Sequence, residues 1–524
     1  MSVVGEAAEL GTVQLKTLLF VGLSLSIGWG IRGNFGHQWG AALPGALAAM
    51  AAVIISGRED WMRRIAYFGA FGAIGWSFGG NMAYMVVIAY THSGHSPSVL
   101  YGFFCLGIIG FLWAAVGGAG TAMPAMLSRE RLAQFCIPLV SMFFLWWVYE
   151  LLTGYFIDRN PRFADNSPLD WHDTNWNAAI LAIVAVFAHA AVRRRIDWAE
   201  KLILWMAVGW WIGFLTITVG IHFLMAPNKG EDWSGSVGMT AALFIYLYRN
   251  GCKGAVMAGL ITGVLGGLAF PLGVLFKLLE MYITHDYPTN WHSILEQSYG
   301  FMNGLAQAAG ILLLVKTSPA ASDEPAVSRA YNAFMVAFLM LLLTYLNIWK
   351  EVNDWITAKA VAPQLYFLTT SAWFDLFYLL LAGTVLLLLR EHLRRPLPFI
   401  PVMSLGKAQM LYLALLWWMV IANFMKALVA FGPQRLVTEG TIFVNGLLCT
   451  LMALLWARRS QMPSVSVSPV YWPTLRKTIL RGSVALLLCP FLCWGVVRAI
   501  YGDRFAGEAG HHYRFGPKAV PAKE

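Results

Sequence analysis

Charged residues are scarce in this chain of 524 residues: Asp, Glu, Lys and Arg make up 12% of it, against 58% hydrophobic residues. The mean hydropathy is +0.61. A soluble protein of this length cannot bury so much apolar surface, so the composition excludes an ordinary soluble globular protein. It predicts an all-α polytopic membrane protein whose first partner is the lipid bilayer.

Acidic residues are scarcer than basic ones, with 27 Asp and Glu against 37 Lys and Arg. In a membrane protein such a basic excess belongs to the cytoplasmic loops. No basic cluster interleaved with aromatic residues lies outside the apolar runs, so nucleic acid is not an expected partner. The first 16 residues are mildly polar and show no cleavable signal peptide.

Cysteine is rare too, and its six residues all lie within or beside apolar runs. That placement excludes a disulfide framework. Cys489 and Cys493 stand one helical turn apart, a spacing that two small core residues explain better than a metal site does. The motifs GxxxxGK[ST], HExxH and CxxC are absent, so the sequence assigns no cofactor and no metal.

About fifteen apolar runs are long enough to span or nearly span a bilayer, since a transmembrane helix needs ~20 residues. Three of them, 41–56, 177–192 and 237–249, are short, and the sequence leaves their full crossing open. The expected cores are 17–31, 41–56, 65–90, 99–122, 133–156, 177–192, 202–225, 237–249, 254–279, 298–316, 330–349, 366–390, 408–431, 441–457 and 479–500.

The loops richest in Lys and Arg fall on alternate sides of successive spans if all fifteen runs cross the membrane. The intervening loops are rich in His, Asp, Asn and Trp. The positive-inside rule then places the N-terminus and the basic loops in the cytoplasm, and the C-terminus outside. We expect this topology in a bacterial inner (plasma) membrane.

Internal similarity indicates a repeat. YTHSGHSPSVLYGF (90–103) resembles YITHDYPTNWHSILEQSYGF (282–301), and the stretch 209–243 resembles 416–448. We infer a parallel unit of about six spans that is used twice, followed by its first three spans (6+6+3), an organisation found among transporters. The implied divisions are 1–198, 199–404 and 405–500 for the membrane repeats and 501–524 for a polar C-terminal tail.

Polar residues among the spans mark the candidate site. The glycine-rich stretch GWGIRGNFGHQWG (28–40) puts Arg32, Asn34 and His37 at the outer end of the first span. Glycine-rich backbone at that depth must be satisfied by protein or by a wet cavity. A pocket for an anionic or hydroxyl-rich solute explains these residues, and so does an interfacial arginine with glycines for close helix packing.

Further polar side chains are expected in the outer half of the membrane. Asn81, His222 and Asp375 complete the expected cavity, although each alone also suits an interhelical hydrogen bond. Asp375 and Glu150 stand out because a carboxylate in hydrocarbon must pair or take up a proton. Either could pair with Arg32 or Lys426, or carry protons.

The outer loops contain the remaining chemistry, since they combine acidic, amide, His and Trp side chains. Such residues suit a polyhydroxylated ligand, and they suit an aromatic belt at the membrane interface equally well. The candidates in these loops are Asp170, His172, His285, Asp286 and Asp354.

Three functions compete on this evidence. The duplication favours a multi-pass transporter for a polar solute, a sugar or an organic anion, with an outward-facing cavity. The concentration of carboxylates, His and Trp on one side favours a membrane-embedded transferase acting on a lipid-linked or lipid-headgroup substrate at the outer face, with Asp or His as general base. A structural subunit of a larger membrane complex is the third. The sequence does not decide whether the protein is an enzyme.

Overall fold

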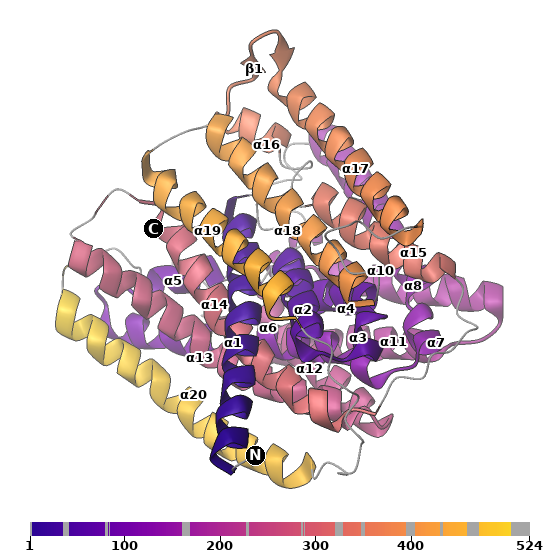
Figure 1. Ribbon diagram of the computed structural model, residues 1–524. Coiled ribbons are helices and arrows are strands. Elements are labelled where there is room, and N and C mark those ends of the chain that lie inside the picture. Colours follow the sequence, from indigo (N-terminus) through magenta and orange to yellow (C-terminus); the bar gives the residue numbers. More distant parts are fainter. Residues whose placement is uncertain are drawn as a thin grey trace.

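The computed structural model of the chain describes residues 3–34, 41–78, 82, 84–159, 168–226, 230–284, 287, 289–319, 329–346, 352–394, 404–429, 433–457, 471–502 and 504. Helices account for nearly all of this part of the chain (Figure 1). A two-stranded antiparallel hairpin, β1 (Gln364–Leu365) with β2 (Leu368–Thr369), is the one sheet among these residues.

The helices follow one another in chain order. The first group is α1 (Val3–Asn34), α2 (Ala42–Ser56), α3 (Glu59–Met62), α4 (Ile65–Ser77), α5 (Tyr84–Tyr90), α6 (Ser96–Met126), α7 (Arg129–Ala133), α8 (Cys136–Arg159) and the 3₁₀ helix η1 (Pro168–Asp173). The second group is α10 (Trp176–Arg193), α11 (Trp198–Phe214), the π-helix η2 (Leu215–Gly220), α12 (Asp232–Arg249), α13 (Lys253–Thr284), α14 (Trp291–Thr317), α15 (Arg329–Ala337), the π-helix η3 (Phe338–Leu342), α16 (Val352–Thr357), α17 (Thr370–Arg394), α18 (Ser404–Val429), α19 (Pro433–Leu455) and α20 (Tyr471–Tyr501).

Eleven helices of the described chain are long and apolar enough to cross a membrane. The chain is therefore an all-α integral membrane protein, as the composition predicts. Three shorter apolar helices cover 42–56, 65–77 and 330–342, where the sequence predicts further spans. The count of fifteen, the 6+6+3 repeat with its divisions and the orientation in the membrane stay predictions.

The predicted span 65–90 is wrong as a single helix. Helix α4 ends at Ser77, and α5 begins at Tyr84. Two consecutive glycines, Gly79 and Gly80, fall between the two helices, and glycine disfavours helix by about 1 kcal/mol relative to alanine. The indole N–H of Trp113 donates to the carbonyl oxygen of Trp76 over 2.6 Å and so satisfies one carbonyl near the end of α4.

Close pairs of helices build the interior. Helix α1 packs along α14, α6 along α13 and α2 along α4. Glycines lie at these contacts: Gly304 of α14 faces the backbone of Gly22 in α1, and Gly110 of α6 faces that of Gly266 in α13. Because a Cβ at either position would overlap the facing backbone, the small residues allow the helices to approach closely.

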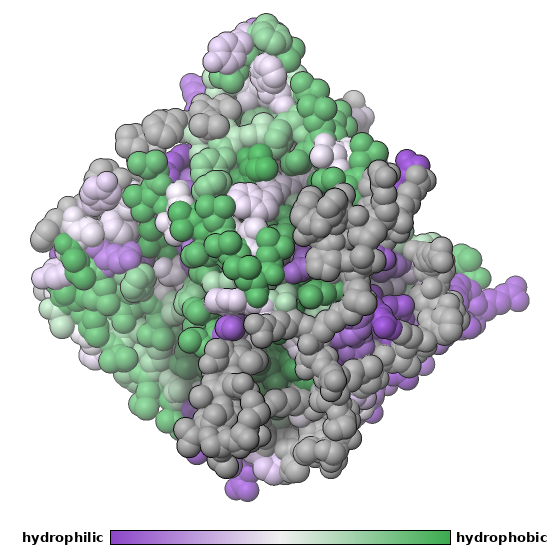
Figure 2. Space-filling model, viewed as in Figure 1, coloured by the Kyte–Doolittle hydropathy of each residue, from purple (hydrophilic) through white to green (hydrophobic). Residues whose placement is uncertain are grey.

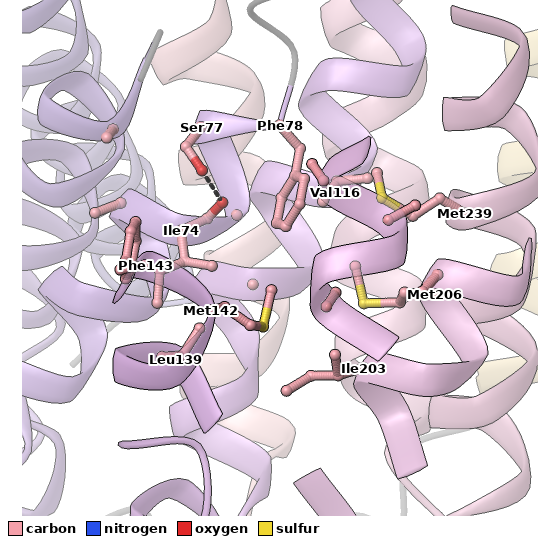
Figure 3. Close-up of a pocket in the computed structure, with 18 of the residues that line it drawn as sticks. Ile74, Ser77, Phe78, Val116, Leu139, Met142, Phe143, Ile203, Met206 and Met239 are labelled. Atoms are coloured by element: carbon pink, nitrogen blue, oxygen red, sulfur yellow. Dashed lines mark hydrogen bonds between the residues drawn. The ribbon is translucent and has the colours of Figure 1, made fainter. Parts of the chain in front are cut away.

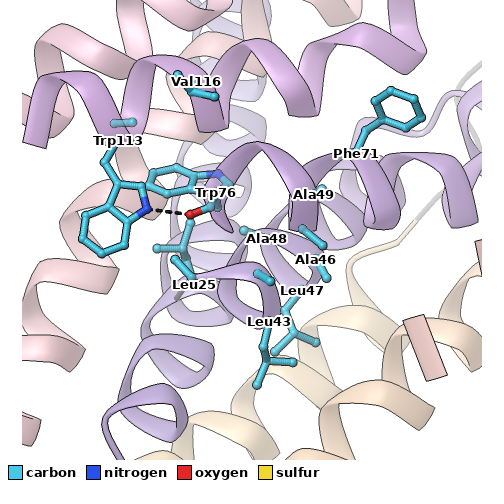
Figure 4. Packing of buried hydrophobic residues seen from close by; sticks show 14 of the residues in the cluster. Leu25, Leu43, Ala46, Leu47, Ala48, Ala49, Phe71, Trp76, Trp113 and Val116 are labelled. Atoms are coloured by element: carbon cyan, nitrogen blue, oxygen red, sulfur yellow. Dashed lines mark hydrogen bonds between the residues drawn. The ribbon is translucent and has the colours of Figure 1, made fainter. Parts of the chain in front are cut away.

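Large aromatic side chains fill the remaining space of the core (Figure 4). Trp76 and Trp113 are fully buried beside the alanine-rich face of α2, where residues 46–49 have no exposed surface. Trp29 of α1 packs edge-on against both tryptophans, with ring centroids 5.8 Å and 5.1 Å away. The three tryptophans therefore form one buried cluster where α1, α2, α4 and α6 pack together.

The outer helices expose apolar side chains. On α8, α17 and α20 many large hydrophobic residues are solvent-exposed in the isolated chain, as expected for helices that face lipid. Figure 2 shows apolar residues over much of the viewed face, including the area of α20. Helix α20 packs on α13 and α6, where Trp494 donates to the Ser96 hydroxyl over 3.0 Å.

Candidate functional site

A fully buried ion pair lies between α1 and α14. Nη1 of Arg32 donates to Oε1 of Glu296 over 2.9 Å, and Nη2 of Arg32 donates to the Tyr84 hydroxyl over 3.1 Å. The side chains of Arg32 and Glu296 are 1% and 4% exposed. His292, one turn before Glu296 on α14, has Nε2 3.3 Å from the same carboxylate oxygen. A buried charge pair is costly, so these residues are a candidate functional site.

Glycines of α1 make the pair possible. A Cβ at Gly33 would overlap Oε2 of Glu296, and a Cβ at Gly30 would meet the Gln297 side chain. The glycine-rich sequence around Arg32 therefore lets the polar residues of α14 reach the surface of α1. The glycines thus serve close packing and admit a carboxylate of α14, whereas a pocket for a solute and an interfacial position of Arg32 stay predictions.

Three aromatic rings surround the Arg32 guanidinium. Its central carbon lies 5.6 Å from the ring of Trp29, 5.6 Å from that of Tyr84 and 5.4 Å from that of Trp113. Such cation–π contacts strengthen when they are shielded from water. We call Trp29, Tyr84 and Trp113 the aromatic cage.

The polar face of α14 continues inward from this pair. His292, Glu296, Tyr299, Asn303 and Gln307, which we call the polar row, follow at intervals of three or four residues and so share one helix face. Tyr299, Asn303 and Gln307 are 1%, 0% and 0% exposed. Gln307 accepts a hydrogen bond of 2.7 Å from the indole N–H of Trp76. The polar row thus runs from the edge of α14 into the helical core.

A separate cavity of about 560 Å³ opens between α4, α6, α8, α10, α11 and α12. Its lining is mainly apolar: Phe78, Met142, Met206 and Met239 point into it (Figure 3). Phe78, at the end of α4, is 42% exposed and is one of the lining residues. A space of this size and character accepts a hydrocarbon chain better than it accepts a sugar.

The same cavity carries a few polar groups. Asp232, the first residue of α12, is buried and accepts hydrogen bonds of 3.1 Å from the Asn175 backbone N–H and 3.2 Å from the Asn175 amide. Glu150 of α8 also lines the cavity and accepts 2.8 Å from the Trp146 indole. Within the described chain no group of three or more acidic, His or Cys residues is arranged to hold a metal ion.

Two predicted histidines meet near Asp232. Burial lowers the pKa of His172 below its usual value of 6.5, and the neighbouring His222 lowers it further. The His172 carbonyl accepts from the backbone N–H of Glu231, the residue before Asp232. His172, Asp173 and His222 have φ of 55°, 50° and 55°, a left-handed backbone that is uncommon for non-glycine residues.

The other predicted residues are dispersed. Arg32 pairs with Glu296. It pairs with neither Glu150 nor Asp375, so both predicted partners of this arginine are wrong. Asp375 is half-buried on α17, and Asp354 is exposed on α16. The backbone of Asp170 lies in η1, and that of Asn34 ends α1. The structure does not describe the side chains of these two residues. His37, Asn81, His285 and Asp286 lie outside the described residues.

The sequence interpretation missed Glu296 and Asp232. It assigned Glu296 to an outer loop, although the polar spacing from 292 to 307 is that of one helix face. Asp232 falls between the expected spans 202–225 and 237–249, and only the fold reveals that it is buried.

The fold and these sites define an integral membrane protein of many helices, with an apolar cavity and a buried polar row. Comparison with protein-family models, with curated proteins and with solved structures finds no match to this chain.

Proposed function

We propose that the protein is a membrane-embedded transferase acting on a lipid-linked substrate, the second of the sequence-based hypotheses. The cavity of about 560 Å³ carries this proposal. Its methionine- and phenylalanine-rich lining suits the hydrocarbon part of an amphipathic molecule, and flexible methionine side chains adapt to a chain without fixed shape.

The polar groups at the cavity fit the reacting part of such a substrate. Asp232 and Glu150 are the carboxylates that line it. A carboxylate acting as general base accepts the proton of an acceptor hydroxyl while that oxygen bonds to the transferred group. The lipid-side oxygen then leaves with the electron pair of the broken bond. Asn175 holds Asp232 in place from the backbone and the side chain, which suits a base that must be positioned.

A labelling experiment tests the proposal. Purified protein is placed in sealed proteoliposomes that contain polyprenyl and phospholipid acceptors, and a labelled pool of sugars, sugar phosphates and organic acids is added outside. Label recovered in lipid establishes a transferase. Asp232→Asn should abolish that incorporation, whereas Glu130→Gln, at an exposed residue of α7, should leave it intact. Absence of label from the lipid in the wild-type reaction rejects the proposal.

The Arg32–Glu296 pair favours transport of a polar solute as the second candidate, because intramembrane charge pairs mark solute and ion pathways. The same vesicles distinguish the two functions. Label that is chemically unchanged, free inside the vesicles and dependent on a pH gradient would establish the transporter.

A further inference from the structure

The structure points to a second feature, independent of the lipid cavity: we infer that the polar row of α14 is a hydrated path that carries water from the His292 end to the interior beside Trp76. The inference uses the geometry of α14 and its neighbours alone. It therefore holds or fails separately from the proposed transferase.

Buried polar atoms along the row carry the inference. The Gln307 amide nitrogen is buried and has no hydrogen-bond partner among the described residues. The Tyr299 hydroxyl and the Asn303 carbonyl oxygen are buried too, and although these two side chains interact, neither atom has a hydrogen bond of good geometry. A buried polar atom without a partner is costly, because its lost hydrogen bonds to water are not replaced. Three such atoms on one helix face would be an unusual burden, and bound water is the common way in which proteins satisfy them.

The path has one half-exposed end. The His292 side chain is 30% exposed, whereas Glu296, one turn further in, is 4% exposed. Polar groups follow one another from there to Gln307 at the spacing of a helix face, so a chain of water molecules can pass from partner to partner. Arg32 and Tyr84 border the outer part of the row through their contacts with each other and with Glu296.

Glycine and aromatic neighbours shape the inner part. Tyr299 stacks on Phe270 of α13, with ring centroids 4.2 Å apart. A Cβ at Gly266 of α13 would lie 2.2 Å from the Ala114 Cβ and 2.8 Å from the Asn303 carbonyl oxygen, so glycine is needed for α13 to pack this closely beside that atom.

The inner end reaches the wall of the lipid cavity. Gln307 binds the indole of Trp76, and the neighbours of Trp76 in sequence, Gly75 and Ser77, line that cavity. A small void of about 10 Å³, lined by Phe78 and Trp113 among others, lies next to the cavity on this side. The hydrated path therefore ends one side chain away from the proposed lipid site.

Thiol reactivity tests the path. In a chain whose six native cysteines are replaced by alanine, a single cysteine is introduced at Asn303, Gln307 or Ala308. Ala308 is the matched control, because it is as buried as Gln307 and adjacent to it but points away from the row. N-ethylmaleimide reacts with the thiolate, which forms only where water can solvate it, so N303C and Q307C should react at least about tenfold faster than A308C.

Hydroxyl-radical footprinting tests the unaltered protein and does not depend on the folding of any variant. Radicals generated from bound water oxidise the side chains beside it. Tyr299 should be modified several-fold faster than Tyr412, an equally buried tyrosine whose hydroxyl lies 2.7 Å from that of Ser24. Equal rates for the two tyrosines, or equal maleimide rates for Q307C and A308C, overturn the inference.

Discussion

Arg32 and Glu296 are 264 residues apart in sequence, and their side chains meet at 2.9 Å inside the helical core. Either charge alone would destabilise the folded state at this buried position. The Tyr84 hydroxyl and the aromatic cage further stabilise the Arg32 guanidinium. The contact joins α1, α5, α6 and α14. A rearrangement that separates α1 from α14 must therefore break this pair.

Removing one partner of this pair should destabilise the fold severely. Glu296→Ala leaves the Arg32 guanidinium buried without its counter-charge, and breaking a buried ion pair in this way costs about 3–5 kcal/mol. Thermal unfolding in detergent measures the effect. The double variant Arg32→Met with Glu296→Met should cost less than the sum of the single ones, because no charge remains buried.

An exposed ion pair is the control for these variants of Arg32 and Glu296. Arg63 and Glu59 are 3.6 Å apart with side chains 42% and 26% exposed, and Arg63→Ala should change the stability by about 1 kcal/mol or less. Equal losses for Arg63→Ala and Glu296→Ala would show that the buried pair has no special role in stability.

Gly33→Ala should disrupt the same pair from the side of α1. The new methyl group would overlap Oε2 of Glu296. Since a carboxylate is the movable end of a flexible side chain, it would turn away from Arg32 while the backbone stays in place. We expect a lower unfolding temperature, with most of the loss absent when the substitution is made in a Glu296→Ala background.

A helical glycine with open space around it is the control for Gly33. A Cβ at Gly383 of α17 meets no atom within 4 Å, and alanine favours helix over glycine by about 1 kcal/mol. Gly383→Ala should therefore leave the unfolding temperature unchanged or raise it. A loss at Gly383 as large as that at Gly33 would contradict the explanation by overlap with Glu296.

The sequence predicts the membrane class and singles out Arg32, because both predictions depend only on short stretches of sequence. Apolar runs of sufficient length identify spans, and an arginine among them demands an explanation. The partner of Arg32 is a different matter. Glu296 follows an aromatic, His-rich stretch that reads as a loop, and only the packing of α1 along α14 brings the two residues together.

The cavity is beyond sequence reasoning for a related reason. Its lining comes from helices spread between residue 42 and residue 346, and each lining residue alone resembles a lipid-facing or core residue. Asp232 illustrates this: its sequence neighbourhood predicts a solvated acid, whereas in the fold it is buried beside Asn175. In contrast, His172, expected in an outer loop, and His222, expected at the outer end of the span 202–225, lie close to each other in the fold.

Acid should destabilise the region around His172. Burial and His222 lower the pKa of His172 in the folded state, so the unfolded chain binds a proton more readily than the folded one. The contribution of unprotonated His172 to the stability of the folded state is then fully present above pH 6.5, and it is lost as the pH drops from 6.5 to the lowered pKa. Unfolding temperatures at pH 7.5 and 5.5 measure this loss, and His172→Gln should reduce it while changing little at pH 7.5. An unchanged acid loss in the variant would show that His172 does not titrate in this way.

Filling the cavity should abolish binding of a lipid-linked substrate without unfolding the protein. Ala179 of α10 lines the cavity, whereas Val184 on the same helix is 46% exposed and is not among the lining residues. Ala179→Trp places an indole where we propose the hydrocarbon chain lies, and Val184→Trp adds the same group on the lipid-facing side. Retention of a photoreactive polyprenyl lipid in detergent measures binding. We expect cross-linking to be lost in Ala179→Trp and kept in Val184→Trp, with both variants monodisperse. Equal cross-linking in the two would place the lipid elsewhere on the protein, and the transferase proposal would lose the observation on which it rests.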